Sequence, residues 1–217
     1  MTAAHPNILF VITDQQRADH VGFAGNEVVN TPVLDGLAAR GTVFDQAWVA
    51  NPVCMPNRST IMTGRMPSAH GVIFNDRSLD WGANTHVRCF RDAGYRTALI
   101  GKSHLQHGMS RNSVLPVDGA PVAEDPWPPE WDRLEDSERY ERSLPEFPDS
   151  FYGFDHVELA IDHGARVSGH HLHWALHRGG RHEDLAVPMD ASAPYRRRSD
   201  RWWQIYEPPY DPELHST

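Results

Sequence analysis

The hydrophobic positions of the chain fall into short runs bounded by turn residues, and three of these runs predict strands. Residues 7–13 read NILFVIT, and residues 95–100 form a run that ends at Gly101-Lys102. Short runs of this kind, rich in β-branched residues, are typical of strands buried on both faces of a parallel sheet. Residues 42–49 are the third strand candidate.

Helix signals alternate with these strands. Thr31-Pro32 predicts a helix start, with Thr31 as N-cap and Pro32 at the first helical position, and Gly41 ends the apolar stripe that follows. Further helices are predicted over residues 84–92 and 167–177, and a further strand over residues 154–161. This alternation predicts an α/β fold with a mostly parallel sheet flanked by helices, in which ligands bind beyond the carboxyl ends of the strands.

The charge of the chain is concentrated in one segment. The formal net charge is −9, from 20 Lys+Arg and 29 Asp+Glu. Residues 118–149 hold eleven Asp/Glu and three Arg, a net of −8, so the rest of the chain carries −1. We interpret residues 106–150 as an acidic, Pro-rich insertion, with a short helix around residues 134–142. A loop of this length is either a functional lid or an ordinary solvated excursion, and both interpretations stay open.

Composition excludes several classes of protein. The acidic balance argues against a nucleic-acid partner. No apolar run approaches the ~20 residues that a membrane span needs, and residues 1–16 lack the basic and apolar regions of a signal peptide. Two cysteines, Cys54 and Cys89, are too few for a disulfide scaffold. We therefore expect a cytoplasmic protein with no membrane partner.

The most specific segment begins at Cys54, where the chain reads Cys-Met-Pro-Asn-Arg before a predicted helix. The proline stiffens the loop after the cysteine, and Arg58 with the free N–H groups of the helix start would form an anion site. A nucleophile beside an anion site suits attack on a phosphoryl or sulfuryl centre. From these residues alone, a small cysteine packed in the core is an equal alternative for Cys54.

The pattern Cys-x-Pro-x-Arg followed by Ser-Thr-x-x-Thr-Gly-Arg, over residues 54–65, resembles the signature of the formylglycine-dependent sulfatases. Asp14, after the first predicted strand, resembles the family's first metal ligand. Residues 31–38 resemble its first helix, and residues 101–105 resemble its active-site Gly-Lys-x-His-Leu. The resemblance implies an alkaline-phosphatase-like fold, with residues 1–217 as the N-terminal part of a catalytic domain that is cut before its active site is complete.

The resemblance also implies a mechanism. A separate maturation enzyme would oxidise Cys54 to formylglycine, which hydrates to a diol, attacks the sulfur of a sulfate ester and finally releases sulfate. Calcium or magnesium would be held by Asp14, by the modified Cys54 and by Gln15, where many family members carry a second Asp. An amide oxygen can ligate calcium, and the alternative is that Gln15 only orients Asp14.

Three further residues have implied catalytic roles. Arg58 would bind a tetrahedral oxyanion, Lys102 would bind sulfate oxygens, and His104 would assist deprotonation of the diol. If the backbone stays extended after the third predicted strand, Lys102 and His104 point to one face. The structural alternative is that Lys102 only extends toward solvent and His104 makes a loop hydrogen bond.

Other residues of the family site are missing from the chain. The remaining metal ligands and a second His and Lys come from the second half of family domains, and Asp155-His156 and Asp162-His163 do not stand in a matching context. We therefore expect the isolated chain to need a missing C-terminal half or a partner chain. The alternatives to a sulfatase are a phosphonate monoester or phosphodiester hydrolase of the same superfamily, and a non-catalytic fragment.

Overall fold

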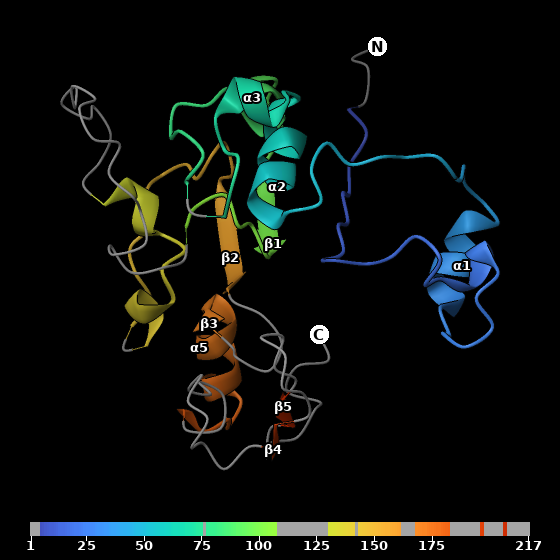
Figure 1. Cartoon of the computed structure of the whole chain (residues 1–217). Helices are drawn as coiled ribbons and strands as arrows, with labels where there is room; N and C mark the ends of the chain where they lie inside the picture. Colours follow the sequence, from blue (N-terminus) through green and yellow to red (C-terminus); the bar gives the residue numbers. More distant parts are fainter. Residues whose placement is uncertain are drawn as a thin grey trace. The chain divides into compact units, whose positions relative to one another are not determined.

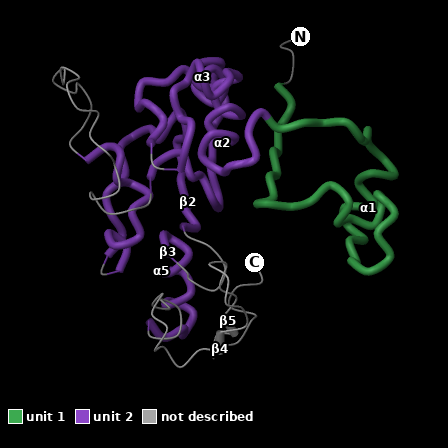
Figure 2. The backbone as a smooth tube through the Cα atoms, viewed as in Figure 1, with its two compact units in different colours: residues 1–49 green, residues 50–217 purple. Residues whose placement is uncertain are grey.

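The computed structural model describes residues 5–75, 77–107, 130–141, 143–161 and 168–182, and the backbone of two short strands near the C-terminus. The chain divides into two compact units, Met1–Val49 and Ala50–Thr217 (Figure 2).

The unit Met1–Val49 contains the 3-10 helix η1 (Gly22–Ala24) and the helix α1 (Pro32–Ala38). The predicted helix start is confirmed, with Pro32 in the first turn, although α1 ends three residues before Gly41. The Thr31 side chain does not cap the helix. Its Oγ1 instead accepts the Gly22 N–H at 2.7 Å, which ties η1 to α1.

The strands predicted at residues 7–13 and 42–49 are wrong for this unit. The described residues 5–49 contain no strand, and the side chains of Leu9 and Trp48 are 88% and 89% exposed. A buried strand needs a neighbouring strand for its N–H and C=O groups and a layer over each face. The hydrophobic pattern is present here, but nothing within the unit's described residues covers it.

The unit Ala50–Thr217 contains a three-stranded sheet in the order β1 (Ala98–Gly101), β2 (His156–Ile161) and β3 (Ser168–Gly169). Strands β1 and β2 run parallel and side by side (Figure 1), whereas β3 pairs antiparallel with the end of β2. A second, two-stranded sheet joins β4 (Arg196–Arg197) to β5 (Tyr206–Glu207). The strands predicted at residues 95–100 and 154–161 are confirmed with later starts, and the parallel pair has the α/β character expected.

The described residues of this unit include the helices α2 (Cys54–Thr63), α3 (Pro67–His70), α4 (His86–Asp92) and α5 (His170–His177). Helix α4 is the one predicted over residues 84–92, and the Thr85 Oγ1 caps it by accepting the Arg88 N–H. Gly64 follows the end of α2, and its φ of 66° is a conformation that suits glycine. Among the described residues, none of the helices combines the length and hydrophobicity that a bilayer crossing requires.

One buried core joins α2 to the segments that precede and follow β1. Met55, Leu79, Leu105, Phe151 and Tyr152 are each at most 2% exposed and belong to the same cluster. The Tyr152 hydroxyl donates to the Leu79 carbonyl oxygen at 2.6 Å, so the phenol is satisfied inside the core. Burial of each large side chain of this kind contributes about 1.5–3 kcal/mol, which fixes the loop after β1 against α2.

Part of the predicted acidic insertion packs into the core of the unit. Residues 108–129 and 142 lie outside the described residues, and residues 130–141 contain two 3-10 helices, η3 (Trp131–Arg133) and η4 (Ser137–Tyr140). The short helix expected around residues 134–142 is therefore the single turn η4. Leu134 is 5% exposed and Tyr140 is fully buried. This part of the acidic segment belongs to the core of the unit.

Candidate active site

Cys54 is the first residue of α2 and is partly exposed. No side chain caps the helix from Val53, and the Met55 N–H donates to the Asn75 Oδ1 at 2.9 Å. The start of a helix carries a partial positive charge, which favours an anion nearby. The structure therefore places Cys54 at a helix start and not in the core. The helix begins earlier than expected, because Cys54 and Pro56 belong to α2 and not to a loop before it.

Arg58 lies one turn further along α2 and is 7% exposed. Its Nη1 donates to the Lys102 carbonyl oxygen at 2.6 Å, across 44 positions of the sequence. A hydrogen bond from a charged donor is stronger than a neutral one. This bond joins the helix that begins at Cys54 to the loop that carries Lys102 and His104, so two predicted elements of the site meet.

The loop after β1 is not extended, contrary to the condition on which Lys102 and His104 would share one face. Gly101 has a φ of 109° and His104 a φ of 50°. Alternation of side chains holds only while the strand continues, and these two residues turn the chain away from it. Glycine adopts a positive φ freely, whereas for other residues this conformation is uncommon and persists where the surrounding structure holds it.

Glu135 is not singled out by any sequence motif, yet its carboxylate contacts this loop directly. Oε2 accepts the His104 N–H at 2.6 Å, while Oε1 accepts the N–H groups of Leu105 at 2.9 Å and Gln106 at 3.2 Å. The side chain comes from the acidic insertion, 31 positions after His104, and Glu135 is 3% exposed. The only local signal is the pair of apolar positions, Leu134 and Tyr140, that carry this segment into the core.

Burial raises the pKa of the Glu135 carboxyl to about 7, although the three N–H donors act to lower it. Removal from water disfavours the charged form, whereas hydrogen bonds to the carboxylate favour it. The two effects oppose each other, so the carboxyl changes its charge near neutral pH.

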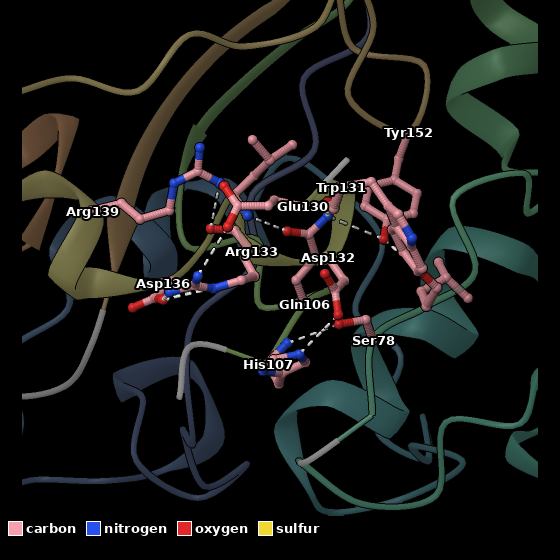
Figure 3. Close-up of polar contacts among 12 residues, drawn as sticks. Ser78, Gln106, His107, Glu130, Trp131, Asp132, Arg133, Asp136, Arg139 and Tyr152 are labelled. Atoms are coloured by element: carbon pink, nitrogen blue, oxygen red, sulfur yellow. Dashed lines mark hydrogen bonds and ion pairs between the residues drawn. The ribbon is translucent and has the colours of Figure 1, made fainter. Parts of the chain in front are cut away.

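Gln106 and His107 continue the contact between the loop and the insertion (Figure 3). The Gln106 Nε2 donates to the Trp131 carbonyl oxygen at 2.6 Å, and its Oε1 accepts the Leu134 N–H at 2.8 Å. The His107 N–H donates to the Ser78 Oγ at 3.1 Å, and its Nε2 lies 3.2 Å from an Asp132 carboxylate oxygen.

The expected metal ligands Asp14 and Gln15 belong to the unit Met1–Val49, where both are exposed and Gln15 has a φ of 48°. Their oxygen atoms fit a hard cation in kind. They are too few in number, because calcium takes about 6–8 oxygen ligands. The described residues contain no group of three or more His, Cys, Asp or Glu that could hold a metal ion. The ligand set of Asp14, Gln15 and Cys54 stays a prediction.

Histidines at the start of α5 have structural contacts. The His170 Nδ1 accepts the Leu159 N–H at 3.1 Å, and the His173 Nε2 lies 2.8 Å from the Tyr140 carbonyl oxygen. These bonds attach α5 to β2 and to η4.

Comparison with known proteins gives the fold and the family. The chain resembles the crystal structure of the phosphonate monoester hydrolase of Agrobacterium radiobacter with a TM-score of 0.58 and 24% identity, over 93% of this chain and 33% of that one. At this identity the likeness concerns the fold alone, and it confirms the expected alkaline-phosphatase-like α/β class.

Curated relatives match about half of the chain. An arylsulfatase of Clostridium perfringens is 40% identical over 101 residues, which are 46% of this chain and 21% of the relative. The human steryl-sulfatase is 37% identical over 122 residues, 51% of this chain and 21% of the relative. The chain thus spans about a fifth of the length of the curated relatives it matches. The sulfatase family model matches residues 6–141, more than half of the chain, and the chain therefore belongs to the sulfatase family.

Proposed function

We propose that the complete protein hydrolyses sulfate esters at a site to which this chain contributes Cys54, Arg58, Lys102 and His104. Membership of the sulfatase family supports this reaction class. The observation that carries the proposal is the hydrogen bond from the Arg58 guanidinium to the Lys102 carbonyl oxygen, because it joins the cysteine helix to the lysine–histidine loop.

The side chains of the proposed site have different chemical roles. Arg58 and Lys102 are two cations on joined elements, and together they offset the negative charge of a sulfate group. A histidine side chain can accept and return a proton, which suits His104 to activation of the nucleophile. The chain would form the N-terminal part of the catalytic domain, and the other ligands would come from the remainder of the protein.

Cys54 is the position at which a separate maturation enzyme would form formylglycine, whose hydrate supplies the nucleophile. Asp14, Gln15 and the modified Cys54 would hold calcium or magnesium, and such a cation polarises the ester and favours the deprotonated nucleophile when it is bound. A cytoplasmic location and a small-molecule sulfate ester as substrate complete the proposal.

Peptide mass spectrometry after co-expression with a maturation enzyme tests the role of Cys54. The proposal requires conversion at Cys54 and none at Cys89, an exposed free cysteine outside the motif that serves as an internal control. An unchanged Cys54, under conditions that convert a control sulfatase, contradicts the proposal.

Rates on an aryl sulfate and an aryl phosphodiester, measured in parallel on the complete protein, test the substrate class. We expect the sulfate to be preferred, because a lysine at position 102 suits sulfate binding, and a preference for the diester would favour the phosphonate monoester or phosphodiester alternative. We expect the isolated chain to show little or no turnover. Clean turnover by the 217-residue chain with stoichiometric calcium would contradict that expectation.

A further inference from the structure

We propose that Glu135 is a positioning residue of this site, whose carboxylate holds the loop carrying Lys102 and His104 in the conformation that the reaction uses. The inference rests on the proposed function for its catalytic consequence. Its structural part, the control of the loop by Glu135, can be measured without any turnover.

The two carboxylate oxygens of Glu135 divide their contacts with the loop. Oε2 accepts the 2.6 Å bond from the His104 N–H, and Oε1 accepts the bonds from Leu105 and Gln106 at 2.9 and 3.2 Å. Three consecutive main-chain N–H groups therefore point to one side chain. Hydrogen bonds to an ionised acceptor are about twice as strong as neutral ones, so the carboxylate can determine the path of the loop.

The loop needs such a restraint. His104 has a φ of 50°, and a residue other than glycine in this region carries about 1–3 kcal/mol of strain that the surroundings must offset. The Arg58 guanidinium holds the carbonyl of Lys102, two residues before the first N–H group that Glu135 holds. A cation and an anion from distant parts of the sequence thus fix the segment from Lys102 to Gln106 at its two ends.

Satisfying the three N–H groups of the loop does not by itself require a carboxylate. A buried charge is unfavourable unless it is paired and hydrogen-bonded, and a neutral acceptor such as a carbonyl oxygen can satisfy an N–H group at a smaller penalty. Packing is already supplied by Leu105, which is 2% exposed and whose carbonyl oxygen accepts the Leu79 N–H at 2.8 Å.

The test compares Glu135→Gln with Glu138→Gln, a matched removal of one negative charge at an exposed position of η4. The amide of glutamine keeps one acceptor oxygen, so one side of the former carboxylate becomes an N–H₂ group that faces an N–H donor. Hydrogen–deuterium exchange of the peptide that spans residues 102–107 should be at least about tenfold faster in Glu135→Gln and within about twofold of wild type in Glu138→Gln. Equal protection in wild type and Glu135→Gln overturns the proposal.

Kinetics on the complete, matured protein separate a positioning role from a general loss of structure. On an aryl sulfate we expect Glu135→Gln to lower kcat at least about tenfold with a smaller change in KM, because the loop that loses an acceptor carries His104, the residue that would move the proton. Glu138→Gln should retain wild-type values. A Glu135→Gln enzyme with unchanged kcat overturns the catalytic part even if the loop exchanges faster.

The experiments distinguish a failure of the proposed sulfatase activity from a failure of the proposed role of Glu135. A wild-type protein that converts Cys54 but cleaves no sulfate ester contradicts the proposed function, and the exchange of residues 102–107 still decides whether Glu135 controls the loop. If Glu135→Gln does not unfold cooperatively, Glu135→Asp takes its place, since it keeps the charge and withdraws the carboxylate by one methylene. Wild-type exchange in Glu135→Asp then overturns the proposal.

Discussion

The ionisation of Glu135 should make the stability of this protein depend on pH in a defined direction. The pKa of its carboxyl rises from 4.5 to about 7 because the side chain is buried. Between these two pH values the folded state therefore binds more protons than the unfolded state. The contribution of the Glu135 carboxyl to the free energy of unfolding is complete below pH 4.5 and is lost as the pH rises through 7. A shift of this size changes the free energy of unfolding by about 2.5 kcal/mol between about pH 5 and pH 8.

Urea denaturation at about pH 5 and pH 8, on wild type and Glu135→Gln, measures this difference. Glutamine does not titrate, so subtracting the pH dependence of the variant from that of wild type isolates the carboxyl from all other groups. The subtraction is needed because histidines whose pKa is lowered by burial have the opposite dependence. Glu138→Gln, a matched removal of one carboxyl at an exposed position, is measured beside it as the control. If Glu135→Gln loses as much stability as wild type over this pH interval, the reasoning about Glu135 is refuted.

Three further predictions concern the contacts around the site. Arg58→Met removes the donor to the Lys102 carbonyl oxygen and should lower the free energy of unfolding by about 2 kcal/mol in urea denaturation; a change within error would show that this bond does not hold the loop. Tyr152→Phe removes the buried bond to the Leu79 carbonyl oxygen and should lower the melting temperature, with a loss of about 1–3 kcal/mol; an unchanged melting curve contradicts this. Burial lowers the pKa of His170 below 6.5, so its ring should titrate at lower pH than a free histidine in an NMR titration, and its contribution to stability should fall as the pH drops below 6.5; a pKa at or above 6.5 would contradict the described environment.

Much of the candidate site could be predicted from local sequence, because its proposed residues lie mostly in two short motifs. Residues 54–58 place the cysteine and the arginine one helical turn apart, and this depends only on the helix that follows. The same holds for α1, whose start is marked by Pro32 although the Thr31 side chain does not cap it, and for α4, which Thr85 caps. Caps and turn residues act within a few positions, so a sequence can specify them without the rest of the fold.

The strands and the loop conformations were harder to predict from the sequence. Residues 7–13 have the hydrophobic run of a buried strand as clearly as residues 95–100 do, yet among the described residues only the latter run pairs with a neighbour, β2. A strand depends on hydrogen bonds to another segment, and its own pattern does not say whether that segment is present. The extended backbone on which a shared face of Lys102 and His104 depended is absent for a related reason, because contacts from outside the loop hold His104 at a positive φ.

The sequence by itself determined the family of this protein and placed a helix close to the Cys-x-Pro-x-Arg motif. Only the tertiary structure decided that the Arg58 guanidinium reaches the Lys102 carbonyl and that a glutamate of the acidic insertion holds the loop beyond it. Contacts over 44 and 31 positions leave no periodic trace in the chain, because they arise when the core brings distant segments together and excludes water from the groups between them.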